Sequence, residues 1–117
     1  MMQLVGNPAS PFVRKVRVML IETGQTDEVE MIETVTTAVD PSPEATAANP
    51  LKKIPALIRP DGCTLYDSRV ITRFLDARAD ANLYKNNRLW EILTLEATAD
   101  GLLDAAVLMV YEGRVRP

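Results

Sequence analysis

The 117-residue sequence contains no histidine and only one cysteine, Cys63. Without histidine it lacks the commonest zinc ligand and the usual general base of enzymes. A single cysteine can form neither an internal disulfide nor a multi-thiolate metal site. We therefore expect no metal centre, and any chemistry has to proceed without a histidine base. Cys63 itself is expected to fill a place in the core.

Basic clusters and long apolar runs are also missing. The formal net charge is -3, and no group of lysines and arginines is interleaved with aromatic residues, so we expect no nucleic-acid partner. No stretch approaches the apolar length that spans a bilayer, and the first residues lack the pattern of a signal peptide. A soluble cytoplasmic protein without a membrane partner is expected, with one compact domain or one domain plus a piece of another.

A helix is predicted close to the N-terminus. Its apolar residues recur three or four positions apart: Val13, Val16 and Leu20. Ser10 is expected to cap this helix, with Pro11 in its first turn, where the missing N–H costs nothing. Gly24 supplies the stop signal. The pattern is that of an amphipathic helix with one face on a core.

Four short strands and a second helix complete this part of the pattern. The strands are predicted over residues 2–6, 28–34, 55–59 and 63–66. A Pro-Asp-Gly turn at residues 60–62 joins the last two in a hairpin. Residues 38–50 are expected to form a loop with one helical turn, and Ser68 can cap a helix over residues 69–79. The front strand-helix-strand unit implies a parallel crossover, so we predict a mixed four-stranded α/β sheet covered by helices.

A long helical pattern over residues 88–112 follows a polar connection at residues 81–87. Residues 105–111 are apolar on every side, and a helix of that kind has to be buried. The sequence stops at Pro117. We therefore infer that the chain is a piece of a longer protein, that a partner subunit covers this helix, or both.

Three segments of the sequence are informative together. They are Ser-Pro-Phe-Val-Arg-Lys at residues 10–15, Asn-Pro-Leu-Lys-Lys-Ile-Pro at 49–55 and Tyr-Asp-Ser-Arg-Val-Ile at 66–71. In this order they resemble the cytosolic glutathione transferases, and most of all bacterial members with a serine before the first helix. The resemblance implies a homodimer and three parts: a thioredoxin-like glutathione-binding domain over residues 1–80, a linker at 81–87, and the first helix of an incomplete all-α domain at 88–117.

The resemblance implies that Ser10 is the catalytic residue. Its hydroxyl would donate a hydrogen bond to the thiolate of bound glutathione and lower the thiol pKa from about 8.5 toward neutrality. No histidine is available to make Ser10 itself a nucleophile, so the ligand's sulfur would attack a small electrophile. A serine in place of a cysteine also disfavours disulfide exchange. The alternative is that Ser10 only caps the helix.

The same resemblance implies a set of residues that contact glutathione: Phe12, Lys53, Ile54, Pro55, Asp67 and Ser68. A cis bond before Pro55 would present the Ile54 backbone to the ligand's cysteinyl backbone, as an added strand would. Lys53 would lie near the glycyl carboxylate, or simply face solvent. Ser68 at a helix N-terminus would bind the γ-glutamyl carboxylate and Asp67 its ammonium group, although helix capping explains both residues equally well.

Asp100 resembles the position from which some family members reach across the dimer to the neighbouring ligand's amino group. A surface or capping role explains a single Asp-Gly pair as well. The implied function is conjugation of glutathione to a small electrophile, as in detoxification, with glutathione as co-substrate and no metal. Two alternatives stay open: a glutathione-dependent isomerase or dehalogenase on the same scaffold, and a non-catalytic regulatory or binding module.

Overall fold

The computed structural model describes residues 1–37 and 39–115. It divides into two compact units, Met1–Asn82 and Leu83–Pro117, which are described separately. Ala38, the first residue of the predicted loop, and residues 116 and 117 lie outside the described residues.

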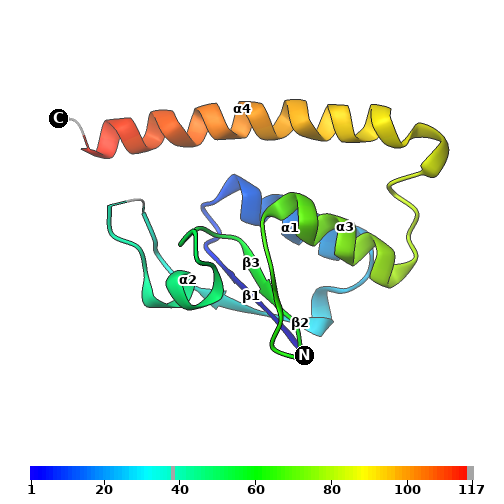
Figure 1. Ribbon diagram of the computed structural model, residues 1–117, viewed down its shortest axis with the longest axis horizontal. Coiled ribbons are helices and arrows are strands. Elements are labelled where there is room, and N and C mark those ends of the chain that lie inside the picture. Colours follow the sequence, from blue (N-terminus) through cyan, green and yellow to red (C-terminus); the bar gives the residue numbers. More distant parts are fainter. Residues whose placement is uncertain (38, 116–117) are drawn as a thin grey trace. The chain divides into compact units, whose positions relative to one another are not determined.

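The first unit is built on a mixed four-stranded sheet with the order β2-β1-β3-β4 (Figure 1). Its strands are β1 (Met2–Gly6), β2 (Val29–Glu33), β3 (Ala56–Ile58) and β4 (Thr64–Leu65). β1 runs parallel to β2 and antiparallel to β3, and β3 runs antiparallel to β4. The predicted α/β fold with a mixed sheet is confirmed. β3 begins only after Pro55, which has no N–H to donate to a ladder.

Helices cover both faces of the sheet. Successive strand residues point to opposite sides, so each face presents apolar side chains that the helices bury. The helices of this unit are α1 (Pro11–Glu22), α2 (Pro43–Ala48) and α3 (Ser68–Ala79). Leu4 and Leu57 belong to the core cluster that α1 and α3 complete, whereas Val5 and Ala56 pack with Ala48 of α2. The larger cluster consists of Met2, Leu4, Val13, Val16, Leu20, Leu57, Ile71 and Leu75.

The ends of α1 agree with the sequence signals. The Ser10 hydroxyl oxygen accepts a hydrogen bond from the Val13 N–H, at 3.3 Å, with Pro11 in the first turn. Beyond the C-terminal end, Gly24 has a φ of 70°, a left-handed conformation that glycine adopts without strain. The hairpin turn is also present, with the Gly62 N–H bonded to the Arg59 carbonyl at 2.9 Å.

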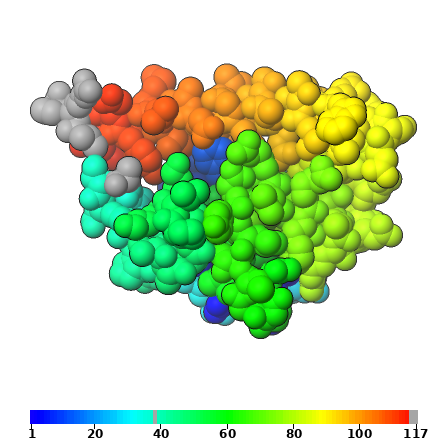
Figure 2. All heavy atoms as spheres, viewed as in Figure 1, coloured from blue at the N-terminus to red at the C-terminus, as the bar shows by residue number. Residues whose placement is uncertain are grey.

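Two expectations about single residues are wrong. Asp67, rather than Ser68, is the N-cap of α3: the Asp67 carboxylate accepts from the Arg69 N–H at 3.0 Å, and Ser68 is already helical. Cys63 is exposed rather than part of the core. The reason is that β4 starts only at Thr64, which leaves Cys63 in the turn. The exposed tip of this hairpin forms part of the green surface in Figure 2.

The second unit contains a short 3-10 turn, Asn86–Arg88, and one long helix, α4 (Leu89–Val115). The predicted helix over residues 88–112 is therefore present. Several large apolar side chains of α4 are exposed: Trp90, Leu95, Leu102, Leu108 and Met109. Among the described residues, no helix combines the length and the apolar character needed to cross a membrane.

Candidate functional site

The three segments singled out in the sequence lie at the same edge of the sheet. Residues 10–15 follow the C-terminal end of β1, and residues 49–55 precede β3. Because β1 and β3 are antiparallel with Val5 opposite Ala56, these two segments meet the sheet at one end. β4 is antiparallel to β3, so its exit into residues 66–71 is at that end too. The topology thus gathers all three segments.

Ser10 is positioned by the loop that leaves β1. The Asn7 carbonyl accepts from the Ser10 N–H at 2.9 Å, and the Asn7 side chain binds both the Ala9 N–H, at 2.9 Å, and the Thr34 carbonyl, at 3.1 Å. Ser10 Oγ accepts from the Val13 N–H and still carries its own proton. The cap therefore leaves the Ser10 O–H able to donate to another group.

Phe12 lies in the first turn of α1 and is half-buried. Its backbone N–H has no hydrogen-bonded partner within the described parts of the chain. Such groups at a helix start point toward the helix N-terminal end and favour negative charge there. The start of α1 thus offers two donors, the Ser10 hydroxyl and the Phe12 N–H.

Asn49 shapes the loop that enters β3. The residue is 2% exposed; its Oδ1 accepts from the Leu51 N–H at 2.8 Å, and its Nδ2 donates to the Lys53 carbonyl at 3.2 Å. Lys52 between them has a left-handed φ of 60°. We did not assign Asn49 a role from the sequence, although an asparagine that binds the N–H two residues on is a familiar turn former.

Replacing Asn49 with alanine should lower the free energy of unfolding by about 1–3 kcal/mol, because a buried side chain with two hydrogen bonds is lost. Urea unfolding of the variant and the parent chain measures this difference. Asn49→Asp is the informative comparison, since it keeps the bond from the Leu51 N–H but cannot donate to the Lys53 carbonyl. Equal stability of the alanine variant and the parent would contradict the assigned role.

Ile54 and Pro55 follow this loop. The Ile54–Pro55 peptide bond is cis, the isomer that the resemblance implies. Ile54 is half-buried and packs against both core clusters, while Lys53 is exposed. Among residues 1–37 and 39–115, neither the N–H nor the C=O of Ile54 has a hydrogen-bonded partner. One backbone donor and one acceptor are therefore open to an extended ligand at this edge.

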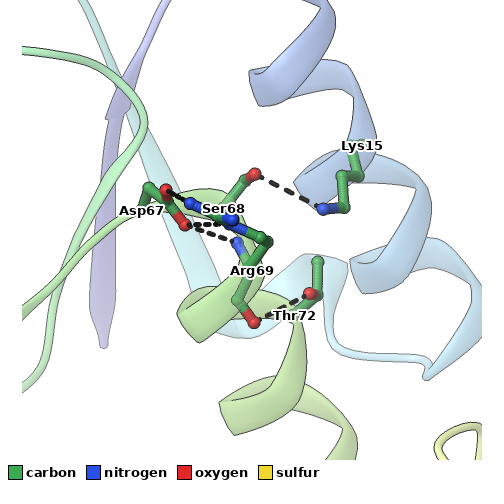
Figure 3. A network of polar contacts seen from close by, with 5 residues as sticks. All are labelled: Lys15, Asp67, Ser68, Arg69 and Thr72. Carbon is green, nitrogen blue, oxygen red and sulfur yellow. Dashed lines mark hydrogen bonds and ion pairs between the residues drawn. The ribbon is translucent and has the colours of Figure 1, made fainter. Parts of the chain in front are cut away.

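The start of α3 carries a network of polar contacts that joins it to α1 (Figure 3). The Asp67 carboxylate accepts from the Arg69 guanidinium at 2.8 and 3.3 Å. Ser68 is buried, and its Oγ accepts from Lys15 Nζ at 3.4 Å. The Thr72 hydroxyl donates to the Arg69 carbonyl at 3.3 Å. The peptide bond between Tyr66 and Asp67 is cis.

Ser68 combines the donors that an anion needs. Its backbone N–H, at the first position of α3, has no partner in the part of the chain that the structure describes. Its hydroxyl and the Lys15 ammonium are adjacent. Free amides at a helix N-terminus together with a hydroxyl and an ammonium group are typical of sites that bind a carboxylate or phosphate.

The Asp67 carboxyl is held ionised at this helix start. Hydrogen bonds from the Arg69 side chain lower its pKa below the usual 3.8, and the Arg69 backbone N–H and the charges of Arg69 and Lys15 act in the same direction, against partial burial. A carboxylate at a helix N-terminus also interacts favourably with the macrodipole. Asp67 is thus an anion whose charge can face a ligand cation.

Asp67→Asn should make the chain less stable at neutral pH, and this difference should disappear as the pH falls below 3.8, the usual pKa of the group. The variant is expected to be the less stable chain because folding lowers the pKa of Asp67. The ionised carboxylate therefore stabilises the fold above the pKa of the unfolded chain, and this contribution is lost when the carboxylate is protonated. Asparagine also caps helices, so the variant isolates the charge. Urea midpoints across the acidic range test this, and a pH-independent difference would contradict it.

The structure therefore places Lys15, which we did not predict as a site residue, beside the adjacent residues Asp67 and Ser68. Asp100 lies within α4, in the second unit, and its role across a dimer stays a prediction. Among the described residues, no group of three or more histidine, cysteine, aspartate or glutamate side chains could hold a metal ion.

Comparison with known proteins gives consistent matches. The family model described as "Glutathione S-transferase, N-terminal domain" matches residues 9–78. An Escherichia coli K12 protein described as the uncharacterized GST-like protein YibF is 34% identical over 99% of this chain and 56% of its own length. A maize protein, glutathione S-transferase 3, is 35% identical over 66% of this chain and 34% of its own length.

Solved structures match over the whole chain. A glutathione transferase family member from Pseudomonas fluorescens Pf-5, with bound glutathione, is 44% identical with a TM-score of 0.94, covering 100% of this chain and 58% of that one. A glutathione S-transferase from Methylobacillus flagellatus with glutathione bound is 41% identical with a TM-score of 0.79, covering 100% and 57%. The chain thus spans a little over half the length of these solved structures.

Proposed function

Because the chain belongs to the glutathione S-transferase family, we propose that it binds glutathione at the sheet edge shared by Ser10, Ile54 and Ser68 and conjugates it, through its sulfur, to a small electrophile. The observation that carries the proposal is a set of backbone groups at this edge that have no partner among residues 1–37 and 39–115: the N–H and C=O of Ile54 and the N–H of Ser68. An extended peptide ligand can pair its own backbone with an open N–H and C=O, and its carboxylate with an open N–H at a helix start.

Each part of the tripeptide has a partner in this proposal. The cysteinyl backbone pairs with the Ile54 N–H and C=O beside Pro55, and Lys53 faces the glycyl carboxylate. The γ-glutamyl carboxylate binds at the Ser68 N–H and hydroxyl, and the ammonium group of the same γ-glutamyl residue pairs with Asp67. The bound forms of the two Pseudomonas and Methylobacillus relatives support this ligand class.

The reacting atom is the ligand's sulfur. The thiol proton leaves to solvent, and the Ser10 hydroxyl donates to the thiolate that remains, with the start of α1 and the Phe12 N–H adding to the favourable field. The sulfur lone pair then forms a bond to an electrophilic carbon, whose bonding pair departs with a leaving group or moves onto an adjacent acceptor. The protein's contribution is positioning and pKa adjustment.

We propose a cytoplasmic homodimer in which Asp100 reaches the amino group of the glutathione bound by the neighbouring subunit. We propose that residues 1–80 are the glutathione-binding domain and residues 81–87 the linker, and that residues 88–117 belong to an all-α domain whose first helix is α4.

Calorimetric titration with glutathione, combined with thiolate absorbance of the bound ligand against pH, tests the function. We expect binding, with the thiol pKa lowered by about one to two units from about 8.5. S-methylglutathione is the control, since it occupies the same site but cannot ionise. Absence of binding would refute the proposal, and binding with an unchanged thiol pKa would favour the non-catalytic module instead.

A further inference from the structure

Lys15 is the cation of α1 that reaches the start of α3. It is half-buried, and its Nζ lies 3.4 Å from Ser68 Oγ, across 53 residues of sequence (Figure 3). The charged neighbours Arg14 and Arg17 are exposed. Lys15 is thus set apart from the other cations of this helix by its direction and its burial.

The Lys15–Ser68 contact determines where the hydroxyl proton of Ser68 can point. An ammonium group donates hydrogen bonds and cannot accept them, so Ser68 Oγ is the acceptor in this pair. The hydroxyl proton of Ser68 is then directed away from Lys15. Because Ser68 is 2% exposed, bulk water does not compete strongly for this hydroxyl. The contact leaves Ser68 as an oriented donor.

The charges around this hydroxyl favour an anion. An ammonium group near a helix N-terminus opposes the positive end of the macrodipole, and a carboxylate placed between them relieves that cost. The nearby carboxylate of Asp67 is turned to the Arg69 guanidinium and backbone N–H, with which it makes three hydrogen bonds. The Asp67 carboxylate thus makes its hydrogen bonds with Arg69, while the charge of Lys15 also lowers its pKa.

We propose that Lys15 is a positioning residue for the γ-glutamyl carboxylate of glutathione. It holds the Ser68 hydroxyl so that its proton points to the carboxylate, and its charge makes the site selective for a ligand with an acidic group at that end. This inference rests on the proposed function. It goes beyond it by assigning the discrimination between a γ-glutamyl tripeptide and a peptide without that carboxylate to a residue of α1.

The test compares two ligands on the full chain: glutathione and 4-aminobutyryl-cysteinylglycine, which lacks only the γ-glutamyl carboxylate. We expect the parent chain to bind the second ligand at least about tenfold more weakly, since hydrogen bonds to a charged group are lost. Lys15→Met should bind glutathione about tenfold more weakly and discriminate far less between the two ligands. Lys15→Arg, which keeps the charge, should restore much of the discrimination.

Arg14→Met is the matched control, because it removes an exposed charge from the same turn of α1. It should discriminate as the parent chain does. If Lys15→Met keeps the parent's discrimination, or loses the same factor for both ligands, the positioning role is overturned. If the parent chain binds neither ligand, the proposed function fails first, and the two failures are thereby distinguished.

Discussion

Replacing Ser10 with glycine should return the pKa of bound glutathione toward that of the free thiol and slow conjugation by about 10- to 100-fold. The reason is the loss of one hydrogen bond to a charged sulfur, a contribution of about 1.5–3 kcal/mol. Glycine is the preferred replacement because it costs only a few tenths of a kcal/mol as an N-cap, whereas alanine costs about 1 kcal/mol. Thiolate absorbance against pH measures the shift directly.

Two further variants separate the roles of Ser10. Ser10→Asp keeps a strong cap for the Val13 N–H but places a negative charge beside the thiolate, so it should raise the thiol pKa above that of the glycine variant. Ser10→Thr keeps the hydroxyl and should retain a lowered pKa. An unchanged thiol pKa in Ser10→Gly would reduce Ser10 to a helix cap.

Gly6→Ala should destabilise the first unit by about 1–3 kcal/mol, the usual cost of overpacking a core. A Cβ atom at Gly6 would lie 2.8 Å from Val13 Cγ2 and 3.0 Å from Val13 Cγ1. Val13 is fully buried and β-branched, so it has little freedom to move aside. Gly6 thus permits the close approach of β1 and α1 that places the Ser10 loop. Urea unfolding measures the loss.

The chain offers a matched control and a rescue for this prediction. Gly101, in α4, has nothing within 4 Å of a Cβ, so Gly101→Ala should leave stability unchanged or raise it by up to about 1 kcal/mol. In a Val13→Ala background, Gly6→Ala should cost much less, because the clashing methyl groups are gone. An equal cost in both backgrounds would show that contact with Val13 is not the cause.

Local signals explain why much of the fold could be predicted. The Ser10-Pro11 start of α1, its apolar spacing and Gly24 all act within a few residues of one another. The Pro-Asp-Gly turn is equally local. The sequence does not predict the cap of α3 correctly, because Asp67 and Ser68 are adjacent and both aspartate and serine are good N-caps, so propensity cannot choose between them.

The candidate site could be predicted only in part, since its assembly depends on long-range pairing. The Asx turn of Asn49 is a local feature and could have been recognised from the sequence. The Lys15–Ser68 contact joins residues 53 apart, and no spacing in the sequence predicts it. The register that sets Val5 opposite Ala56, and so brings the segments to one edge, is likewise a product of the folded sheet.

Glutathione is proposed to bind along Ile54 and at the start of α3. Two-dimensional amide NMR spectra of the chain, recorded during titration with glutathione, test this binding mode residue by residue. We predict saturable shifts of the Ile54 and Ser68 amide signals, because both N–H groups gain a hydrogen-bonded partner. Unchanged signals for these two residues at saturating glutathione, or shifts confined to other regions, would contradict it.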